Sequence, residues 1–325
     1  MKNILNRDKD TVSLVIPTYN RGDLIGATLD SALNQSSPFS EIITVDDGST
    51  DHTSEVLRNY ADRIRIIRTP NKGVQEARNK GAAAAQSKYI TLCDSDDILE
   101  PGFVASIVPW LSAHPPCDIV YCNFVTFDEY ATYADKFSLA PAGFFNGGKR
   151  EDGFLSEIPD LYARTMAFQP LFATGVTFRK SFFEELGGYN AAFNGVGSED
   201  WEFTLRAAYH GNVALCTHPL TRIRRHAGNA SADPIRMSTG EAKILEYFLK
   251  SHKIPSKQAE VIYHNINARR IGAFNVAFAK GDFNSAKNIL SLLDRKPKDL
   301  KFKIKNMIIL LPDILRQAAW WITQN

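Results

Sequence analysis

The stretch VSLVIPTYN, residues 12–20, decides how the first part of the chain folds. An apolar run leads into Pro17 and a polar turn, which is typical of a buried strand that ends at a loop. EIITV at 41–45 and YITLC at 89–93 repeat the pattern, and aspartates follow each of them. We therefore expect three buried strands whose polar ends meet at one edge of a sheet.

Helical patterns separate these strands. They predict helices near 23–35, 51–60 and about 73–85, with a further strand, IRIIR, at 64–68. Apolar strands that alternate with helices favour a parallel sheet covered on both faces, so the fold class is α/β and the first hundred residues form a Rossmann-like half. Ligands of such sheets bind at the carboxyl ends of the strands.

The remainder of the chain shows two further patterns. The first continues to about residue 235 and predicts these elements: a helix to about 113, strand 118–127, a loop at 141–153, strand 171–178, helix 197–210, and strands 212–217 and 220–225. The second contains helices only, near 239–251, 256–280, 282–293 and 300–323. The predicted domains are 1–235, with halves of about 11–100 and 101–235, and a helical region at 236–325.

Composition narrows the class of protein. Among 325 residues, 38 are basic and 36 acidic, a net charge of +2 that gives no reason to expect nucleic acid as a partner. The four cysteines form no CxxC pair, which argues against a zinc site or a disulfide framework and favours reducing cytosol. Neither a signal peptide nor an apolar run of about 18 residues is visible, so we expect a cytoplasmic location.

Three aspartates at the strand ends suit a sugar nucleotide. Asp47 can accept the imide N–H of uracil or thymine, Asp94 can accept ribose hydroxyls, and Asp96 can hold a divalent metal beside a diphosphate. The alternative for each loop is an ordinary acidic turn or helix cap, and each loop alone leaves the two interpretations about equal. Gly143–Lys149 fits a phosphate-binding loop only superficially, because Arg150 stands where Ser or Thr is required.

Six segments resemble the family 2 glycosyltransferases of the GT-A fold, in order and spacing. They are VSLVIPTYNR, VDDGSTD, NKGVQEARNKG, YITLCDSDD, GVGSEDWEFTLRAAYHG and RRHAGNAS. The resemblance covers about residues 11–232. It implies a GT-A nucleotide-diphospho-sugar transferase domain followed by a C-terminal α-helical extension.

The resemblance also implies roles for individual residues. Asp96, in the DxD motif, would bind Mn²⁺ or Mg²⁺, and Asp200 would be the general base that deprotonates the acceptor hydroxyl. The nucleoside pocket would contain Pro17, Tyr19, Asp47, Arg78 and Asp94.

Other residues near these motifs keep two interpretations. His226 would be a second metal ligand or a phosphate contact, or a structural histidine. Arg224 and Arg225 would contact the diphosphate or form a basic strand end. Glu199 and Trp201 would lie near the acceptor, although Glu199-Asp200 also fits an acidic first helical turn.

The expected function is inverting, metal-dependent transfer of a sugar from a UDP- or dTDP-sugar to a hydroxyl of a saccharide or lipid-linked saccharide. The expected setting is polysaccharide biosynthesis for the cell envelope, as the resemblance implies. The alternative is a non-catalytic subunit that binds nucleotide or glycan in an assembly complex. A sugar nucleotidyltransferase is disfavoured, because no Gly-rich nucleotide loop follows the first strand.

The C-terminal segment 301–322 is cationic and amphipathic, with Trp320-Trp321 near its end. Pro312, Asp313 and Arg316 interrupt it too often for a membrane span. Packing on the rest of the chain or on a second subunit is the first interpretation, and peripheral membrane contact the second.

Overall fold

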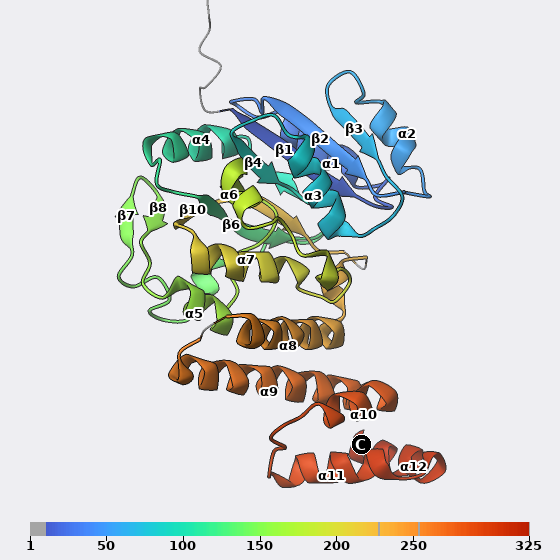
Figure 1. Ribbon diagram of the computed structural model, residues 1–325. Helices are drawn as coiled ribbons and strands as arrows, with labels where there is room; N and C mark the ends of the chain where they lie inside the picture. The colour runs from blue at the N-terminus through green and yellow to red at the C-terminus, as the bar shows by residue number, and fades with distance from the viewer. Residues whose placement is uncertain (1–10, 227, 253, 325) are drawn as a thin grey trace, which may run out of the picture. The chain divides into compact units, whose positions relative to one another are not determined.

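The computed structural model describes residues 11–226, 228–252 and 254–324. These residues form two compact units (Figure 1). The first is built from residues 11–194 and 200–226. The second is built from 195–199 and the described residues from 228 on.

A mixed sheet in the order β3-β2-β1-β4-β9-β6-β10-β8-β7 organises the first unit, and β5 pairs with β10. Its first four strands are parallel, as the sequence predicts, and their order β3-β2-β1-β4 is that of a Rossmann-like half. The bounds are β1 Val12–Thr18, β2 Glu41–Asp46, β3 Arg65–Arg68 and β4 Tyr89–Leu92, with helices α1 Ile25–Leu33, α2 Thr53–Arg58 and α3 Val74–Ala84 between them.

Both faces of β1 are buried, because successive side chains of a strand point to opposite faces of the sheet. Val15 belongs to one apolar cluster, which includes Ala77 and Ala82 of α3. Leu14 belongs to the other, which includes Leu29 of α1. The uninterrupted apolar run in the sequence is thus explained by two cores, one on each side of the sheet.

The second half of the sheet departs further from the prediction. The predicted strands 212–217 and 220–225 form one strand, β10, whose register shifts around Pro219. Only its end, Thr177–Arg179, remains of the predicted strand 171–178. The predicted loop 141–153 contains strand β7. The elements are β5 Ile98–Leu99, α4 Phe103–Ala113, β6 Ile119–Phe127, η1 Phe137–Leu139, β7 Lys149–Glu151, β8 Phe154–Ser156, α5 Leu161–Ala167, β9 Thr177–Arg179, α6 Lys180–Glu185, η2 Ala191–Phe193, α7 Glu199–His210 and β10 Val213–Arg224.

Helices make up most of the second unit. They are η3 Ala230–Ala232, α8 Pro234–Ser251, α9 Ser256–Ala279, α10 Phe283–Ser291, α11 Leu300–Leu310 and α12 Asp313–Gln324. Aspartates cap three of them: the Asp233, Asp282 and Asp299 side chains accept backbone N–H groups of α8, α10 and α11. The helix predicted at 300–323 is two helices, because Pro312 cannot continue the first one.

The helices α9, α10 and α11 share one apolar cluster, to which Phe274, Ile289 and Phe302 contribute. In the part of the chain that the structure describes, no helix has the length and apolar character that crossing a bilayer requires.

Candidate functional site

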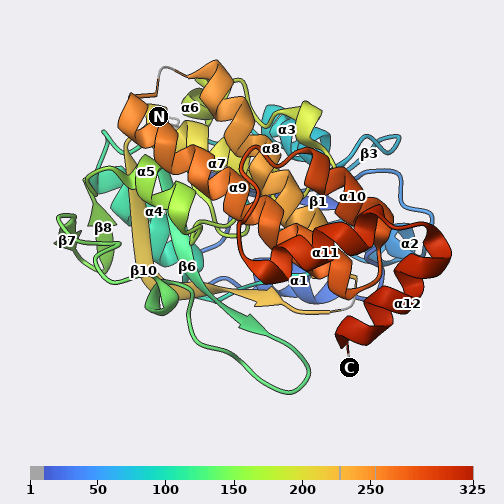
Figure 2. The ribbon, with the colours of Figure 1, turned by 90° about the horizontal axis from the view of Figure 1, so that it is seen from below.

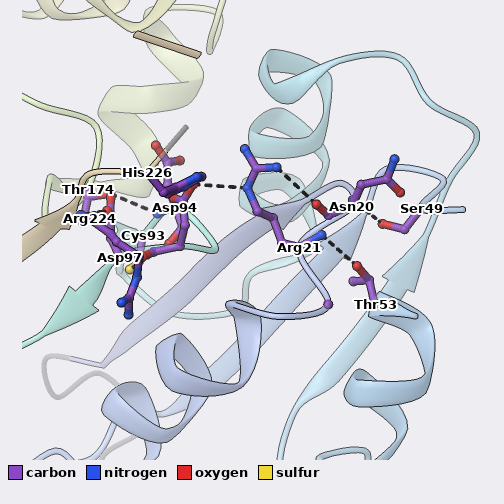
Figure 3. A network of polar contacts seen from close by, with 12 residues as sticks. Asn20, Arg21, Ser49, Thr53, Cys93, Asp94, Asp97, Thr174, Arg224 and His226 are labelled. Atoms are coloured by element: carbon purple, nitrogen blue, oxygen red, sulfur yellow. Dashed lines mark hydrogen bonds and ion pairs between the residues drawn. The ribbon is translucent and has the colours of Figure 1, made fainter. Parts of the chain in front are cut away.

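Two acidic loops lie at the carboxyl edge of the parallel strands. We call residues 46–51, after β2, the first acidic loop and residues 94–97, after β4, the second acidic loop. Strands β2 and β4 each pair in parallel with β1, so both loops flank the turn at Asn20-Arg21 (Figure 3). The sequence-predicted convergence at one edge therefore exists in the structure.

Asp46 is buried, and its contacts stabilise the conformation of its own loop. One carboxylate oxygen accepts the Ser49 N–H at 2.8 Å, and the other accepts the Ser54 hydroxyl at 3.1 Å. The Arg68 guanidinium lies 3.6 Å from the second oxygen. Asp46 is thus a structural residue, in the way that aspartates commonly close turns.

Asp47 is also buried, and it holds the segment after β3. Its Oδ1 accepts the Thr69 hydroxyl at 3.1 Å and the Lys72 N–H at 3.0 Å, and its Oδ2 accepts the Gly73 N–H at 2.7 Å. Since a carboxylate oxygen has two lone pairs, Oδ2 can accept one more hydrogen bond. A cavity of about 410 Å³ borders Asp47, Thr69 and Lys72.

Asn20 joins the turn after β1 to the first acidic loop. Its φ of 51° lies in the left-handed region, which asparagine tolerates better than most residues. Its N–H donates to Ser49 Oγ at 3.0 Å, and its Oδ1 accepts the Thr50 N–H at 2.8 Å. The turn is therefore held in place by the loop beside it.

In the second acidic loop, Asp94 forms an ion pair with a buried arginine. Arg78 Nη2 donates to Asp94 Oδ1 at 2.8 Å, and Arg78 also donates to Gln75. Burial lowers the pKa of Arg78, but Asp94, Tyr189 and Asp200 outweigh it and the net shift is upward. Arg78 therefore remains a fixed positive charge beneath the loop.

Asp96 faces an arginine and a histidine. Its Oδ2 lies 3.1 Å from Arg21 Nε and 3.0 Å from His226 Nε2. In Figure 3, Arg21 extends from the turn after β1 toward the residues around Asp94 and His226. Arg21 also donates its backbone N–H to Thr53 Oγ1 at 2.9 Å, so this residue contacts both the second acidic loop and the start of α2.

Asp97 is the most deeply buried acid of the second loop. It accepts the Thr174 hydroxyl at 2.5 Å and the Arg224 N–H at 2.9 Å. Burial, together with Asp96 and Asp94, raises the pKa of Asp97 well above its usual range, and those hydrogen bonds only partly oppose the shift. Asp97 therefore favours the protonated form more than an exposed aspartate does.

Asp200 lies in the first turn of α7. Its charge raises the pKa of Arg78, Tyr121 and Tyr189, which places it in the electrostatic surroundings of the Arg78–Asp94 pair. Further along α7, Glu202 forms a buried bidentate ion pair with Arg206, with both contacts at 2.7 Å. Arg206 also donates to the Leu186 carbonyl at 2.6 Å and to the Gly188 carbonyl at 2.7 Å, so the helix that carries Asp200 is anchored to the segment after α6.

The other sequence-predicted site residues occupy different environments. Pro17 is buried in β1, and Tyr19 is 44% exposed. Trp201 is fully buried. The Arg224 Nε donates to the Asp96 carbonyl at 3.0 Å, whereas the Arg225 guanidinium lies over the Tyr133 ring, 4.3 Å from its centroid. Glu199 begins α7 and is half-buried.

The donors around Asp96 fit a divalent metal that the substrate completes. Asp96 supplies a carboxylate and His226 an imidazole nitrogen within 3.0 Å of it. Over the described ranges, no three His, Cys, Asp or Glu side chains gather closely enough to hold a metal alone. Mg²⁺ typically takes one or two protein carboxylates and completes its coordination with water and substrate phosphates. The site fits that type of coordination, not a closed protein cage.

Sequence reasoning missed three members of this network: Arg21, Asp97 and Thr174. Arg21 follows the strand-end motif directly and Asp97 follows Asp96, so adjacency could have indicated both. Thr174 lies about 80 residues away, and its hydroxyl also accepts the Asp94 N–H at 3.0 Å. Only the tertiary fold reveals it.

Family models match this part of the chain. Residues 13–170 match the model described as glycosyl transferase family 2. Residues 160–227 match a second model, described as the N-terminal domain of galactosyltransferase. Together the two matches include both acidic loops and the first helical turn that carries Asp200.

Two curated proteins are similar in sequence. Glycosyltransferase GlyG of Streptococcus pneumoniae is 33% identical over 124 residues, which are 37% of this chain and 41% of that protein. A PGL/p-HBAD biosynthesis glycosyltransferase of Mycobacterium tuberculosis is 28% identical over 210 residues, which are 63% of this chain and 72% of that protein. The chain thus spans less than half of the GlyG length.

Solved structures share the fold. Staphylococcus aureus TarS 1–349 in complex with UDP has a TM-score of 0.61 and 16% identity, and the match covers 97% of this chain and 91% of that one. The complex of TarS 1–349 with UDP-GlcNAc has a TM-score of 0.60 and covers 94% and 82%. This likeness shows the fold.

Proposed function

Because the chain belongs to the family 2 glycosyltransferases and has the GT-A fold, we propose that it transfers a sugar from UDP or dTDP to a saccharide hydroxyl with inversion. The observation that carries the proposal is the convergence at Asp96. Its carboxylate meets Arg21 and His226 at the carboxyl edge of the sheet, beside the Arg78–Asp94 pair. Positive groups around an acidic loop suit a diphosphate with its metal.

The base would occupy the cavity beside Asp47. The free lone pair on Asp47 Oδ2 can accept the imide N–H that uracil and thymine carry. Asp94 would accept the ribose hydroxyls, and Pro17 at the end of β1 and Tyr19 just after it would belong to the same pocket. The UDP and UDP-GlcNAc complexes of TarS support a uridine nucleotide as the first choice to test.

Asp96 and His226 would hold Mn²⁺ or Mg²⁺ together with the diphosphate. The metal would neutralise the charge that builds on the departing nucleoside diphosphate. Arg21, which now contacts Asp96, would turn toward the phosphates, and Arg224 is fixed close by through the Asp96 carbonyl. This chain's own contribution is therefore a rigid set of charges around the leaving group.

Asp200 would act as the general base. It would accept the proton of the acceptor hydroxyl while that oxygen bonds to the anomeric carbon and the carbon–oxygen bond to the diphosphate breaks. One displacement from the face opposite the leaving group inverts the configuration, and it needs no nucleophilic carboxylate on the protein. Glu199 and Trp201 flank the base on α7.

The acceptor would be a saccharide or a lipid-linked saccharide of the bacterial cell envelope, used on the cytoplasmic face of the membrane. A mycobacterial relative whose name places it in PGL/p-HBAD biosynthesis supports a glycan-building role.

Calorimetric titration tests the donor class. The protein is titrated with UDP, dTDP and GDP, each with and without Mn²⁺, and the titrations are repeated on Asp96→Ala. Asp62→Ala is the control, because the Asp62 side chain is 81% exposed and lies outside the site. We expect Mn²⁺-dependent binding of UDP or dTDP that Asp96→Ala abolishes and Asp62→Ala retains. If no diphosphate binds, a non-catalytic glycan-binding subunit becomes the better description.

Asp200→Asn tests the chemical step. A general base contributes about 10²- to 10⁴-fold, so turnover should fall by that factor while the nucleotide Kd stays within about twofold. The readout is nucleoside diphosphate release from the donor that calorimetry identifies. Equal turnover by the variant and the parent protein would remove Asp200 from the mechanism.

A further inference from the structure

Helix α12 directs its most apolar face away from the core of the second unit. Ile314 is 88% exposed and Ile322 is 70% exposed, and Leu315, Ala318 and Trp321 are exposed as well. These positions follow a spacing of three, four and seven residues, so they form one stripe along the helix. We call this stripe, with the exposed apolar residues of α11, the apolar face.

The opposite side of α12 is the one fixed to the unit. Trp320 Nε1 donates to the Phe278 carbonyl at 2.7 Å, and the Trp320 ring meets Phe283 edge-on at 6.0 Å. The Arg316 guanidinium lies over the same Phe283 ring. Internal packing therefore accounts for Trp320 and leaves the apolar stripe of α12 outside.

Helix α11 repeats this arrangement. Phe302, Ile308 and Ile309 are buried in the shared cluster, whereas Leu300 and Met307 are 72% and 64% exposed. The two helices follow each other at the C-terminal end of the chain (Figure 2). Both have one apolar face that packs in the unit and a second one whose side chains are largely exposed.

A cationic rim accompanies the apolar face. Between residues 295 and 325 the sequence has seven Lys and Arg but only two Asp and no Glu, a net charge of +5 in a chain whose total is +2. Lys301 and Lys303 of α11 are exposed. On the helical wheel, Lys303 lies between Met307 and Leu310, inside the apolar face.

We propose that α11 and α12 lie on an anionic lipid bilayer, with the apolar face in the headgroup region and the lysines on lipid phosphates. Exposed apolar side chains with lysines beside them are the composition of interfacial helices, and Trp321 suits the boundary between water and acyl chains. Because neither helix is long enough to span a bilayer, they would lie in its plane.

A second copy of the chain fits this surface less well. A two-fold interface places the same patch against itself, so the lysine-rich rims would face each other. Like charges brought together in an interface cost free energy, whereas anionic lipids neutralise them. The proposal does not depend on glycosyl transfer.

Vesicle co-sedimentation of the full chain tests the proposal, with phosphatidylcholine alone and with added phosphatidylglycerol. We expect binding to the anionic vesicles that weakens as salt rises. Ile314→Ser/Ile322→Ser and Lys301→Glu/Lys303→Glu should each reduce it at least about tenfold, since apolar burial and surface charge both contribute.

The controls separate this surface from general charge and from misfolding. Gln317→Ser/Thr323→Ser changes exposed polar positions of α12 outside the stripe, and Lys243→Glu/Lys287→Glu makes the same charge change on exposed lysines of α8 and α10. Both should bind vesicles as the parent protein does. Unchanged thermal unfolding shows that a variant is folded. Failure of the parent protein to bind anionic vesicles would overturn the proposal, and so would a dimer in light scattering that Ile314→Ser/Ile322→Ser dissociates.

Discussion

The two acidic loops look alike in sequence but differ in what their carboxylates contact. In the first loop, Asp46 and Asp47 accept hydrogen bonds mainly from backbone N–H groups and hydroxyls. In the second, Asp94 and Asp96 face the guanidinium groups of Arg78 and Arg21 and the imidazole of His226. Carboxylates that accept backbone amides stabilise the fold of their loop. Carboxylates whose partners are side chains can exchange those partners for a substrate or a metal.

The largest effect should come from Asp47→Ala. Removing the buried carboxylate leaves the partly buried Lys72 and Gly73 amides without their acceptor, at about 1–3 kcal/mol each, so the free energy of unfolding should fall by about 3 kcal/mol. Asp96→Ala should cost less than about 1 kcal/mol, because its ionic contacts are partly exposed. Urea denaturation of both variants measures the difference, and equal losses would contradict the division between the loops.

Gly48→Ala should cost about 2 kcal/mol. Gly48 has a φ of 78°, and an added Cβ would lie 2.8 Å from the backbone nitrogen of Asn71, so both conformation and space oppose a side chain. Gly26→Ala is the matched control, because Gly26 lies within α1, where Ala is favoured, and its added Cβ would meet Tyr60 and Val56 only at ordinary distances of 3.6 and 4.0 Å. Urea midpoints that fall equally for both variants would show that the first loop is not strained in this way.

The pH dependence of stability should have opposite signs in the two loops. Burial raises the pKa of Asp51, but hydrogen bonds from Thr53 and Gly22 outweigh it, so the folded value is lowered. Its stabilisation is present above the unfolded value of 3.8 and is lost as pH falls through the folded value. The folded pKa of Asp97 is raised, so its favourable contribution exists below 3.8 and disappears as pH rises through the folded value.

Asp51→Asn and Asp97→Asn measure these signs. Asp51→Asn should lose stability relative to the parent protein at neutral pH but not in acid. Asp97→Asn should gain relative to the parent as pH rises, since an amide can keep both contacts of the protonated acid, to Thr174 and the Arg224 N–H. Urea midpoints from pH 3 to 8 without divalent metal are the readout. The same sign for both variants would refute the contrast.

The sequence predicts the parallel half well because its signals are local. Apolar runs such as 12–16 and 41–45 are uninterrupted, and parallel strands bring their ends together whatever else the fold does. The second half depends on distant pairing: β9 inserts between β4 and β6, and β10 continues through Pro219 by shifting register. No local pattern encodes either feature.

In the candidate site, too, some features follow from local sequence and others depend on distant segments. Motif spacing indicates which aspartates lie at the carboxyl edge of the sheet. The predicted aspartates of the two loops, Asp47, Asp94 and Asp96, all lie there. Motif spacing cannot distinguish Asp47, which accepts two backbone amides, from Asp96, which contacts Arg21 and His226, because these partners come from other segments. Arg21 illustrates the limit: its side chain contacts an aspartate 75 positions later.

The smallest effect should come from Arg21→Gln, which removes the guanidinium that links the turn after β1 to the second loop. Losing a partly exposed ion pair should cost less than about 1 kcal/mol of stability. Yet it removes a positive charge 3.1 Å from Asp96 Oδ2, so Mn²⁺ alone should bind several-fold more tightly in calorimetry. Arg63→Gln, whose contact with Asp62 is on the surface, controls for net charge and should leave Mn²⁺ affinity unchanged. If Arg21→Gln also leaves it unchanged, Asp96 does not bind the metal, and the second loop would be as structural as the first.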